Sequence, residues 1–443
     1  MADASIGAVT RQDEAYSSAY RMYILLLLTA VYTLNYADRM IFAVVTGQIK
    51  AEFQLDDTTM GFLGGFAFAV VYTTLGLPIA MLADRRSRKV ILTAALSIWS
   101  VFTAVCGLAN STFTLMLARF GVGFGEAGGS PPAHSMISDL FPPEKRATAL
   151  AIFSTGVPLG FMVALWIGGT IAADYGWRMA FYALGLPGLL VALLVWFTLR
   201  EPRRGLSETA ESLAARAAAG ASDAAPSFAT VIGFMLKQPA MRHVLIGGTI
   251  VTFVGYAGVQ WNVQFLERSH GMSLKEASGY LAIVTATASV SGTFLGGWLA
   301  DVLGRRDRRW NAWVVGLFFL LCLPASLVVF STESKDLALA LLPVPVFVAG
   351  LYIGPSFAMT QNLVGIRMRA VAAAFFLFTI NFVGMGGGPT VAGYLSDVFT
   401  AEYGNNALRH ALYVLAFLNI WGALHYFLAA RTLAADYNRA ATA

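Results

Sequence analysis

The sequence predicts an all-α membrane protein with twelve transmembrane helices in two pseudo-symmetric six-helix bundles. Three observations predict it. Hydrophobic residues make up 57% of the 443 residues and charged residues only 12%, whereas soluble proteins carry about 25% charged residues. Twelve apolar runs reach the roughly 20 residues that a helix needs to cross a bilayer. The two halves of the sequence also share several charged and glycine-rich segments at equivalent places.

One polar stretch divides the apolar runs into two sets of six. We expect a cytoplasmic N-terminal tail over 1–20, a first bundle over 21–200, a cytoplasmic linker over 201–239 with a surface helix at Ser227–Lys237, a second bundle over 240–431 and a cytoplasmic C-terminal tail over 432–443. The predicted helices cover 21–48, 59–84, 88–109, 111–140, 145–173, 178–199, 240–268, 274–303, 310–331, 336–364, 368–399 and 407–431.

The basic residues indicate the orientation of the chain. Most Lys and Arg residues fall in the segments on the same side as both termini. Because short cytoplasmic loops are enriched in Lys and Arg, we expect both termini in the cytoplasm. The first apolar run is too long for a cleavable signal peptide and contains Asp38 and Arg39. The short loops favour a bacterial inner membrane, and we expect a monomer.

Several function classes are excluded by what the sequence lacks. The basic residues punctuate apolar helices and form no stripe, so a nucleic-acid partner is not expected. No motif for a metal, a nucleotide or a nucleophile stands out, which argues against an enzyme and against a bound cofactor or metal. The expected partners are the lipid bilayer and a lipid-like or organic-anion substrate.

The two halves repeat each other. The segment Ala80-Met-Leu-Ala-Asp84-Arg-Arg-Ser87-Arg88-Lys89 after the second helix corresponds to Gly297-Trp-Leu-Ala-Asp301-Val-Leu-Gly304-Arg305-Arg306 after the eighth. Arg146-Ala-Thr-Ala after the fourth helix matches Arg369-Ala-Val-Ala after the tenth. Parallel repeats of this kind are typical of transporters that rock two bundles about a central site.

Four charged residues lie inside apolar runs: Asp38, Arg39, Arg119 and Glu126. A charge at that depth costs at least ~2.5–3.5 kcal/mol and is therefore a candidate functional group. At 1.5 Å per residue, Asp38 lies roughly 26 Å, Glu126 roughly 20 Å and Arg119 roughly 30 Å above the inner surface. These depths favour pairing between helices, Asp38 with Arg119 and Glu126 with Arg39.

A carboxylate beside an arginine in a wet cavity is a natural proton carrier. We expect Asp38 and Glu126 to be protonation sites, Arg119 to be their switching partner and Arg39 to anchor an anion, since arginine itself does not titrate. The alternative is that these residues form permanent ion pairs that lock the first bundle. Which of the two carboxylates carries the coupled proton is left open.

The pattern Gly-x-Leu-Ala-Asp-x-x-Gly-Arg-Arg, fully present after the eighth helix, resembles the signature of the major facilitator superfamily. The copy after the second helix departs from it at Ala80 and Ser87. Four further segments resemble the Spinster family of lysolipid and sphingolipid transporters: Leu34-Asn-Tyr-Ala-Asp38-Arg39, Ala118-Arg119-Phe-Gly-Val-Gly-Phe-Gly-Glu126-Ala, Asp139-Leu-Phe and Arg200-Glu-Pro-Arg-Arg-Gly205. Organic-anion symporters of the same superfamily carry a similar Asn-Tyr-x-Asp-Arg motif. The resemblance implies the major facilitator fold, alternating access and a lipid-like substrate.

The second half contributes no charge at mid-membrane depth, only neutral and aromatic side chains. A cavity charged on one wall and apolar on the other suits an amphiphile with an anionic head. The predicted substrate-binding residues are Asn35, Tyr36, Arg39, Arg119, Glu126, Tyr256, Gln260, Trp261, Tyr352 and Asn381. The predicted cytoplasmic gate consists of Asp84, Arg85, Arg88, Arg146, Asp301, Arg305 and Arg369. The resemblance implies that Asp84 and Asp301 cap helices 11 and 5 of the opposite bundle.

Together these patterns predict a secondary transporter that moves a lysophospholipid- or sphingolipid-like amphiphile by alternating access, with the proton gradient as its energy source. One alternative is a proton symporter for a small organic anion, such as a carboxylate or a sugar acid. A second alternative, from another class, is a membrane receptor that does not transport.

Overall fold

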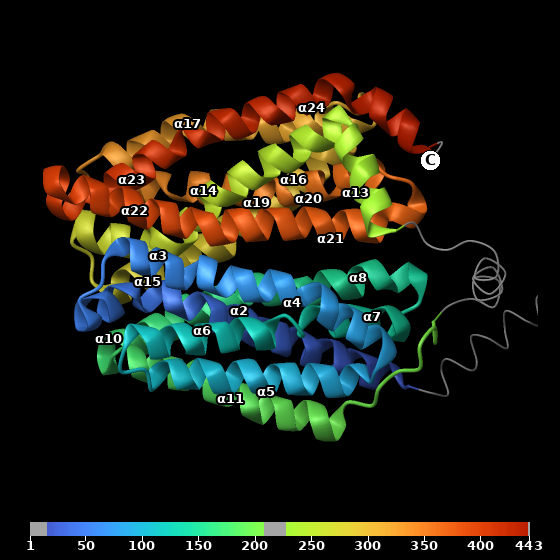
Figure 1. Cartoon of the computed structure of the whole chain (residues 1–443), viewed down its shortest axis with the longest axis horizontal. Helices are drawn as coiled ribbons and strands as arrows, with labels where there is room; N and C mark the ends of the chain where they lie inside the picture. The colour runs from blue at the N-terminus through green and yellow to red at the C-terminus, as the bar shows by residue number, and fades with distance from the viewer. Residues whose placement is uncertain (1–15, 208–226, 442–443) are drawn as a thin grey trace, which may run out of the picture. The chain divides into compact units, whose positions relative to one another are not determined.

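The computed structural model describes residues 16–207 and 227–441, and in these two ranges the chain is helical, without strands (Figure 1). The first half forms α2 (Ser18–Phe53), α3 (Asp57–Gly64), α4 (Phe66–Arg85), α5 (Arg88–Gly107), α6 (Thr112–Glu126), α7 (Ser130–Leu140), α8 (Pro143–Ser154), α9 (Gly156–Met162), the π-helix η1 (Val163–Gly168), α10 (Gly169–Tyr175) and α11 (Trp177–Thr198). The predicted all-α fold is confirmed.

The second half begins with a short helix and continues with longer ones. It forms α13 (Phe228–Lys237), α14 (Pro239–His270), α15 (Leu274–Val284), η2 (Thr285–Ser289), α16 (Val290–Gly304), α17 (Trp310–Ser331), α18 (Lys335–Leu341), α19 (Pro343–Leu351), α20 (Ile353–Asn362), η3 (Ile366–Met368), α21 (Arg369–Thr379), η4 (Ile380–Met385), α22 (Gly386–Tyr403), η5 (Gly404–Asn406), α23 (Ala407–Ala416) and α24 (Leu418–Ala441).

The predicted spans correspond to these helices. In the described ranges, ten helical stretches are long and apolar enough to cross a membrane. The predicted fourth span is absent from the ten because it is divided into α6 and α7, where Gly128 and Gly129 are followed by two prolines. Proline lacks the N–H that would continue the ladder and fits best in a first helical turn. The longest stretch, Arg369–Ala440, contains the last two predicted spans.

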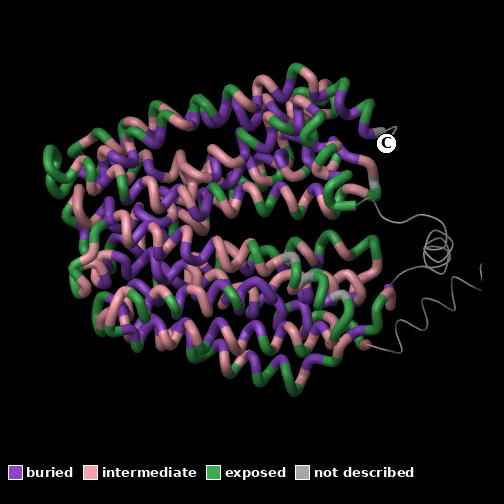
Figure 2. The backbone as a smooth tube through the Cα atoms, in the orientation of Figure 1, coloured by how far each residue is buried: buried purple, intermediate pink, exposed green. Residues whose placement is uncertain are grey.

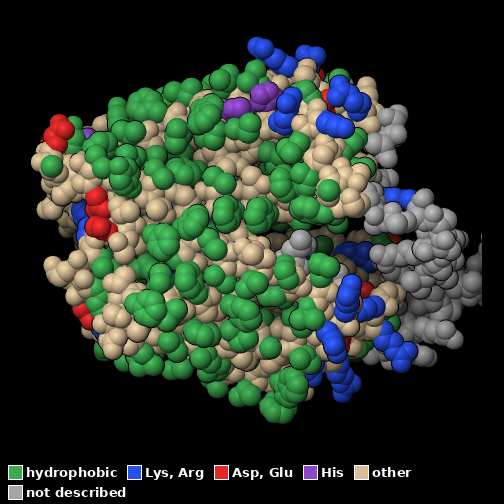
Figure 3. Space-filling view, viewed as in Figure 1, with side chains coloured by type: hydrophobic (Ala, Val, Ile, Leu, Met, Phe, Trp, Pro, Cys, Tyr) green, Lys and Arg blue, Asp and Glu red, His purple; other side chains and the backbone are tan. Residues whose placement is uncertain are grey.

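Hydrophobic side chains cover most of the visible helical surface (Figure 3). They include large side chains that are mostly exposed, such as Phe197, Phe294 and Leu321. An apolar patch of this extent is unusual on a soluble monomer and is what a lipid-facing surface requires. Along the helices, buried, intermediate and exposed positions alternate, so that each helix is buried only on part of its circumference (Figure 2).

The chain divides into two compact units, which are described separately. Unit 1 comprises the described residues of Met1–Met40, Thr74–Ala164 and Arg178–Ala224, and unit 2 those of Ile41–Thr73, Leu165–Trp177 and Ala225–Ala443. These units cut across the predicted bundles 21–200 and 240–431. The last part of α2, together with α3 and α10, groups with the second half because α3 packs along α22 and α10 along α15.

Glycines bring the helices of unit 1 into close contact. A Cβ atom at Gly125 of α6 would lie 2.5 Å from the backbone nitrogen of Trp99 on α5, and one at Gly160 of α9 would lie 2.5 Å from the Thr33 carbonyl oxygen on α2. Small residues let helix backbones approach each other where lipid supplies no hydrophobic driving force. Gly125 therefore brings α6 against α5, and Gly160 brings α9 against α2.

Unit 2 contains the same device between α3 and α22, which lie side by side (Figure 1). A Cβ atom at Gly61 would lie 2.2 Å from the Pro389 carbonyl oxygen, and one at Gly393 would lie 2.1 Å from the Asp57 carbonyl oxygen. The rest of unit 2 is organised around a buried cluster on α14, α17, α20, α21 and α24 that includes Phe376 and Tyr426.

The structure adds detail to the ends of the predicted domains. The surface helix predicted at Ser227–Lys237 is present as α13, with Ser227 as its N-cap. The predicted C-terminal tail over 432–443 instead continues α24 to Ala441, because Leu433 and Asp436 are buried. Asp436 accepts a hydrogen bond from the backbone N–H of Ala240 at 2.9 Å and so caps α14. The N-terminal tail over 1–15 and the linker residues 208–226 lie outside the described residues.

Substitution of Gly393 tests the packing of α3 against α22. Because the added methyl group would overlap the Asp57 backbone, we expect Gly393→Ala to destabilise the protein by about 1–3 kcal/mol. The measurement is the unfolding temperature in detergent. Gly279→Ala on α15 is the matched control, since a Cβ atom there meets nothing within 4 Å. An equal effect of the two substitutions would contradict the prediction.

Candidate functional site

The four charges inside the first-half helices meet in unit 1. Arg39 of α2 donates from Nε and Nη2 to Oε2 of Glu126 on α6, at 2.9 and 2.6 Å. The Glu126 side chain is fully buried and that of Arg39 is 10% exposed. The Arg39 guanidinium also lies over the ring of Tyr36, 4.7 Å from its centroid. The predicted pair of Arg39 with Glu126 is therefore confirmed.

The predicted pair of Asp38 with Arg119 is not a direct hydrogen bond, and the pairing stays a prediction. Both side chains are buried, but neither carboxylate oxygen of Asp38 makes a hydrogen bond. Adjacent residues on a helix point about 100° apart, so when Arg39 faces Glu126, Asp38 is directed toward α5. There it faces Thr103 and Trp99, whose hydroxyl and indole N–H also lack hydrogen-bond partners. Arg119 and Glu126 are close enough to act on Asp38 through their charge alone.

This arrangement leaves the two carboxylates unequal. Glu126 has one oxygen bound to Arg39 and the other, Oε1, buried without a hydrogen bond. Asp38 has no donor on either oxygen. A buried charge without hydrogen bonds is costly, and a carboxyl group avoids that cost when it is protonated. The site can therefore hold a proton, and it can release Arg39 to another anion.

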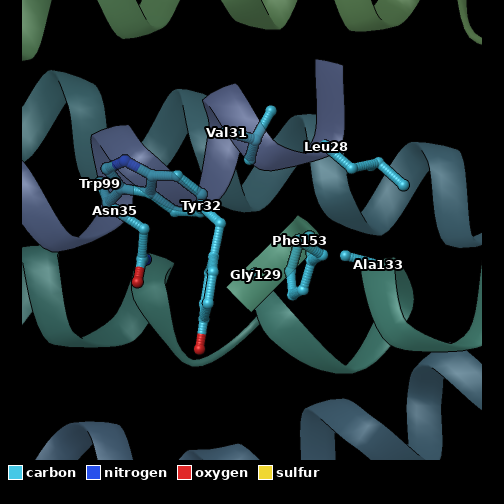
Figure 4. Close-up of a pocket in the computed structure, with 8 residues that line it drawn as sticks. All are labelled: Leu28, Val31, Tyr32, Asn35, Trp99, Gly129, Ala133 and Phe153. Carbon is cyan, nitrogen blue, oxygen red and sulfur yellow. The ribbon is translucent and has the colours of Figure 1, made fainter. Parts of the chain in front are cut away.

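A small hollow adjoins the charged cluster in unit 1 (Figure 4). Its lining is mainly aliphatic and aromatic and consists of Leu28, Val31, Tyr32, Asn35, Trp99, Gly129, Ala133 and Phe153. The oxygen ends of Asn35 and Tyr32 point the same way in Figure 4, and the amide nitrogen of Asn35 makes no hydrogen bond. Asn35 lies three residues before Asp38, so the two share a face of α2. The predicted residues Asn35 and Tyr36 thus lie beside the charges.

The predicted substrate-binding residues of the second half lie in unit 2. Three of them are buried and already hydrogen-bonded. Gln260 donates to Thr46 Oγ1 at 2.8 Å, and Trp261 donates to the Pro389 carbonyl oxygen at 2.9 Å. Tyr352 pairs with the Thr252 hydroxyl at 2.6 Å. Tyr256 and Asn381 are half-buried. These contacts give Gln260, Trp261 and Tyr352 a packing role, and substrate binding by the five residues stays a prediction.

One predicted gate residue lies at the centre of a buried hydrogen-bond network, and its role in the gate stays a prediction. Arg88, at the start of α5, is 1% exposed. Its guanidinium donates to Ser135 Oγ at 2.8 Å, to Asp139 of α7, to Glu201 Oε1 at 3.3 Å and to the Pro202 carbonyl oxygen at 2.6 Å. The network joins α5 and α7 to the segment after α11. The prediction of Arg88 as a gate residue did not anticipate this, because Ser135 and Glu201 are 47 and 113 residues away.

The other predicted gate residues differ in their surroundings. Arg85, Asp301, Arg305 and Arg369 are exposed and make no hydrogen bond or ion pair with any residue of the described ranges. Arg146 donates to Ser207 Oγ at 3.4 Å. Asp84 belongs to α4, but its side chain lies outside the described part of the structure. The cytoplasmic gate therefore stays a prediction.

A second ionic cluster, which we call the Asp57 cluster, was not predicted from the sequence. Asp57, at the start of α3, is 1% exposed. It accepts two hydrogen bonds from Arg268 of α14, at 2.7 and 2.9 Å, one from Lys50 of α2 at 2.5 Å and one from Ser396 of α22 at 2.6 Å. The cluster joins residues up to 339 positions apart in the sequence, and Asp57 stands in a short polar loop between apolar runs. No local pattern could have revealed it.

Asp397 completes the Asp57 cluster by capping α3. It accepts hydrogen bonds from the backbone N–H groups of Asp57 and Thr58, at 3.0 and 2.7 Å, and from the Thr58 hydroxyl at 2.5 Å. The first N–H groups of a helix have no partner within it, and a carboxylate there also interacts favourably with the helix dipole. The cluster thus fixes α2, α3, α14 and α22 to one another in unit 2.

Comparison with known proteins identifies the family. The model of the Major Facilitator Superfamily matches residues 28–389. The chain belongs to the Major Facilitator Superfamily. It is 35% identical over 404 residues to an MFS-type efflux pump of Mycolicibacterium smegmatis, an alignment that covers 91% of each chain. It is 28% identical over 366 residues to the cis,cis-muconate transport protein of Acinetobacter baylyi, which covers 82% of this chain and 84% of the relative.

Among solved structures, the chain is similar to a bacterial homologue of the human lysosomal transporter Spinster. The TM-score is 0.85 at 32% sequence identity, and the match covers 95% of this chain and 99% of the other. The predicted resemblance to the Spinster family is confirmed. This member of the Major Facilitator Superfamily is an integral, multi-pass membrane transporter, and its family and fold are not those of enzymes. The receptor alternative has no support from the family.

The charge of Glu201 should stabilise the Arg88 network at neutral pH and cease to do so in acid. Burial raises the pKa of the Glu201 carboxyl, but hydrogen bonds from Ser87 and Arg88 outweigh burial and lower that pKa below its ordinary value. A carboxylate with a lowered pKa stabilises the fold above the unfolded-state pKa of about 4.3. That stabilisation is lost as the pH falls through the folded-state pKa. We expect the unfolding temperatures of the wild type and Glu201→Gln to differ at neutral pH and to converge below about pH 4.

The control for this measurement is Arg203→Gln. Arg203 is exposed on the same segment, and arginine does not titrate in this range. A difference between the wild type and Glu201→Gln that persists unchanged into the acid range would contradict the role given to the Glu201 charge.

Asp57→Asn tests the Asp57 cluster. The substitution leaves Arg268 and Lys50 without their shared carboxylate, and hydrogen bonds to a charged group contribute about 1.5–3 kcal/mol. We expect a loss of stability of that order, measured as the unfolding temperature in detergent. The matched control is Lys275→Gln, which removes an exposed ion pair with Asp174 at 3.1 Å and should change stability by less than about 1 kcal/mol. Equal losses would refute the importance of the Asp57 cluster.

Proposed function

We propose that this chain is a proton-coupled secondary transporter that moves a lysophospholipid- or sphingolipid-like amphiphile by alternating access. The observation that carries the proposal is the charged cluster of unit 1. There the ion pair of Arg39 with Glu126 lies beside Asp38, a buried carboxylate that faces the neutral side chains of Thr103 and Trp99 and makes no hydrogen bond to an arginine. A carboxylate that served only to lock the bundle would accept hydrogen bonds from a cationic side chain, because a buried charge without such a partner costs several kcal/mol.

Asp38 is the proposed proton carrier. Its carboxyl group is the less compensated of the two, so protonation relieves more of its burial cost than of the cost for Glu126. Arg119 lies close enough to both carboxylates to act on them electrostatically. A shift of Arg119 toward or away from Asp38 would then release or admit the proton, which is how a charge change can bias a conformational equilibrium.

Arg39 is the proposed anchor for the anionic head of the substrate. Its guanidinium is the slightly exposed member of the ion pair and already binds a carboxylate through two donors. A phosphate or carboxylate head can compete with Glu126 for the same two N–H donors of Arg39. Glu126, once displaced, would be the second group to take up a proton. This links binding of the head group to protonation.

The similarity to the bacterial Spinster homologue supports the lipid-like substrate, since it covers nearly the whole chain. The relative named as an efflux pump favours export as the direction of transport. The relative named as a cis,cis-muconate transport protein favours the second candidate, a proton symporter for a small organic anion. Both candidates use the same charged cluster, and they differ in whether an alkyl chain must be accommodated.

We also propose that the protein resides as a monomer in a bacterial inner membrane with both termini in the cytoplasm. The distribution of Lys and Arg between the loops supports this orientation.

Transport by purified protein in liposomes tests the proposal. We expect uptake of a fluorescent lysophospholipid that is accelerated at least about fivefold by a pH gradient, a typical size for coupling between two sites. In Asp38→Asn the acceleration should be lost because the side chain cannot ionise. In Glu126→Gln the dependence on pH should also weaken, since Arg39 is then permanently released.

Asp174→Asn is the control, because Asp174 lies in an exposed pair with Lys275 and should leave flux and its pH dependence unchanged. Flux with an unaltered pH dependence in both Asp38→Asn and Glu126→Gln would refute proton coupling. Transport of cis,cis-muconate without any transport of lysophospholipid would refute the lipid-like substrate and leave the coupling intact.

A further inference from the structure

Two histidines that the proposed transport cycle does not use face each other in unit 2. His243 lies on α14 and His425 on α24, and their Nδ1 atoms are 2.9 Å apart. The ring centroids are 5.1 Å apart and the ring planes are inclined by 45°. The two residues are 182 positions apart in the sequence. Tertiary packing alone brings these nitrogens together.

The separation of the two nitrogens is that of an N–H···N hydrogen bond, and it also equals the separation that one coordination geometry requires. Two histidine nitrogens at about 2.0–2.1 Å from one ion are about 2.9 Å apart when the ligand angle is near 90°, and about 3.4 Å apart when it is tetrahedral. Ligand angles near 90° are typical of Cu²⁺ and Ni²⁺. We propose that His243 and His425 form a two-histidine chelate for a divalent transition-metal ion with tetragonal geometry.

The scaffold holds the two rings in place. α14 and α24 pack along each other in unit 2. Tyr426, next to His425, is fully buried against Gly247 of α14 and pairs with the Ser356 hydroxyl at 2.6 Å. A binding site gains affinity when packing orients its ligands in advance. Without an ion, one imidazole donates its Nδ1–H to the other. On binding, that proton moves to Nε2 of the same ring, so both rings remain neutral.

The pair is also accessible to water. Both rings are half-exposed, and His243 lies four residues after Pro239, about 6 Å along the helix from its first residue. Trp421 is exposed, with its ring centroid 6.0 Å from that of His425, and Arg242 is exposed beside His243. Trp and Arg of this kind are typical of the membrane–water interface. Water molecules can therefore complete the coordination of an ion bound by two protein nitrogens.

Arg242 is the charged side chain that acts on His243. Its positive charge opposes a cation, so the affinity must come from the nitrogen ligands themselves. This favours Cu²⁺, which binds nitrogen ligands most tightly among the divalent ions of the first transition series. A bound ion would cross-link α14 to α24 and stabilise unit 2, because a ligand that binds only the folded state raises its stability.

The test is a titration of the full-length protein with Cu²⁺, in detergent and with any polyhistidine tag removed. We expect one bound ion whose paramagnetic resonance spectrum shows tetragonal symmetry and splitting from two nitrogens. His243→Ala and His425→Ala should each weaken binding at least about tenfold, the loss typical of a damaged metal site. Addition of Cu²⁺ should raise the unfolding temperature of the wild type and not that of either variant.

His134→Ala and His410→Ala are the matched controls, because each of these rings bonds only to a carbonyl oxygen four residues earlier on its own chain segment. Both controls should bind Cu²⁺ as the wild type does. Equal Cu²⁺ affinity in the wild type and in the double variant of His243 and His425 would overturn the proposal. A loss of Cu²⁺ affinity in the controls as large as that in His243→Ala and His425→Ala would also overturn it. His243→Gln, which keeps a polar side chain, serves as the folded variant if His243→Ala does not fold.

Discussion

The proposed function of this transporter depends on the ion pair of Arg39 with Glu126. It lies where water is scarce, so both charges would be unfavourable without each other. Because Arg39 uses its guanidinium for Glu126, the adjacent Asp38 is directed to another side of α2 and remains without a donor. Glu126 is therefore hydrogen-bonded to Arg39, whereas Asp38, the residue next to Arg39, is not. That difference assigns different chemical roles to two acids of similar depth.

Each compact unit is also held by a buried ionic centre of its own. In unit 1, Arg88 joins α5 and α7 to the segment that follows α11, and its donors end on two carboxylates, a hydroxyl and a carbonyl oxygen. In unit 2 the buried centre is a carboxylate, Asp57, which accepts hydrogen bonds from α2, α14 and α22. Both centres have most of their hydrogen-bonding capacity satisfied, unlike Asp38. Full satisfaction is typical of structural networks, whereas an unsatisfied buried group calls for a functional explanation.

Much of the fold could be predicted because membrane helices are specified locally. Length, hydropathy and the repeated Asp-Arg segments were enough to place the helices, and the resemblance to the Spinster family held over the whole chain. The surface helix α13 was also predicted from the sequence, and Ser227 provides its N-cap. The sequence did not indicate that the C-terminal tail packs against the second half, because Asp436 is polar in sequence but buried in the structure, where it caps α14. Its partner lies 196 residues earlier, outside the reach of any local pattern.

The sequence by itself determined which charges are buried, since Asp38, Arg39, Arg119 and Glu126 stand within apolar runs that must lie in lipid. It also determined that Arg39 and Glu126 lie at compatible depths, because depth follows from the rise per residue along a helix. Only the tertiary structure decided the partners. It directed Asp38 to Thr103 and Trp99, assigned Arg88 to Glu201 and Asp139, and brought Asp57 to Arg268 and His243 to His425. Rotation about the helix axis and contacts across hundreds of residues set these pairs, and both depend on how the helices pack.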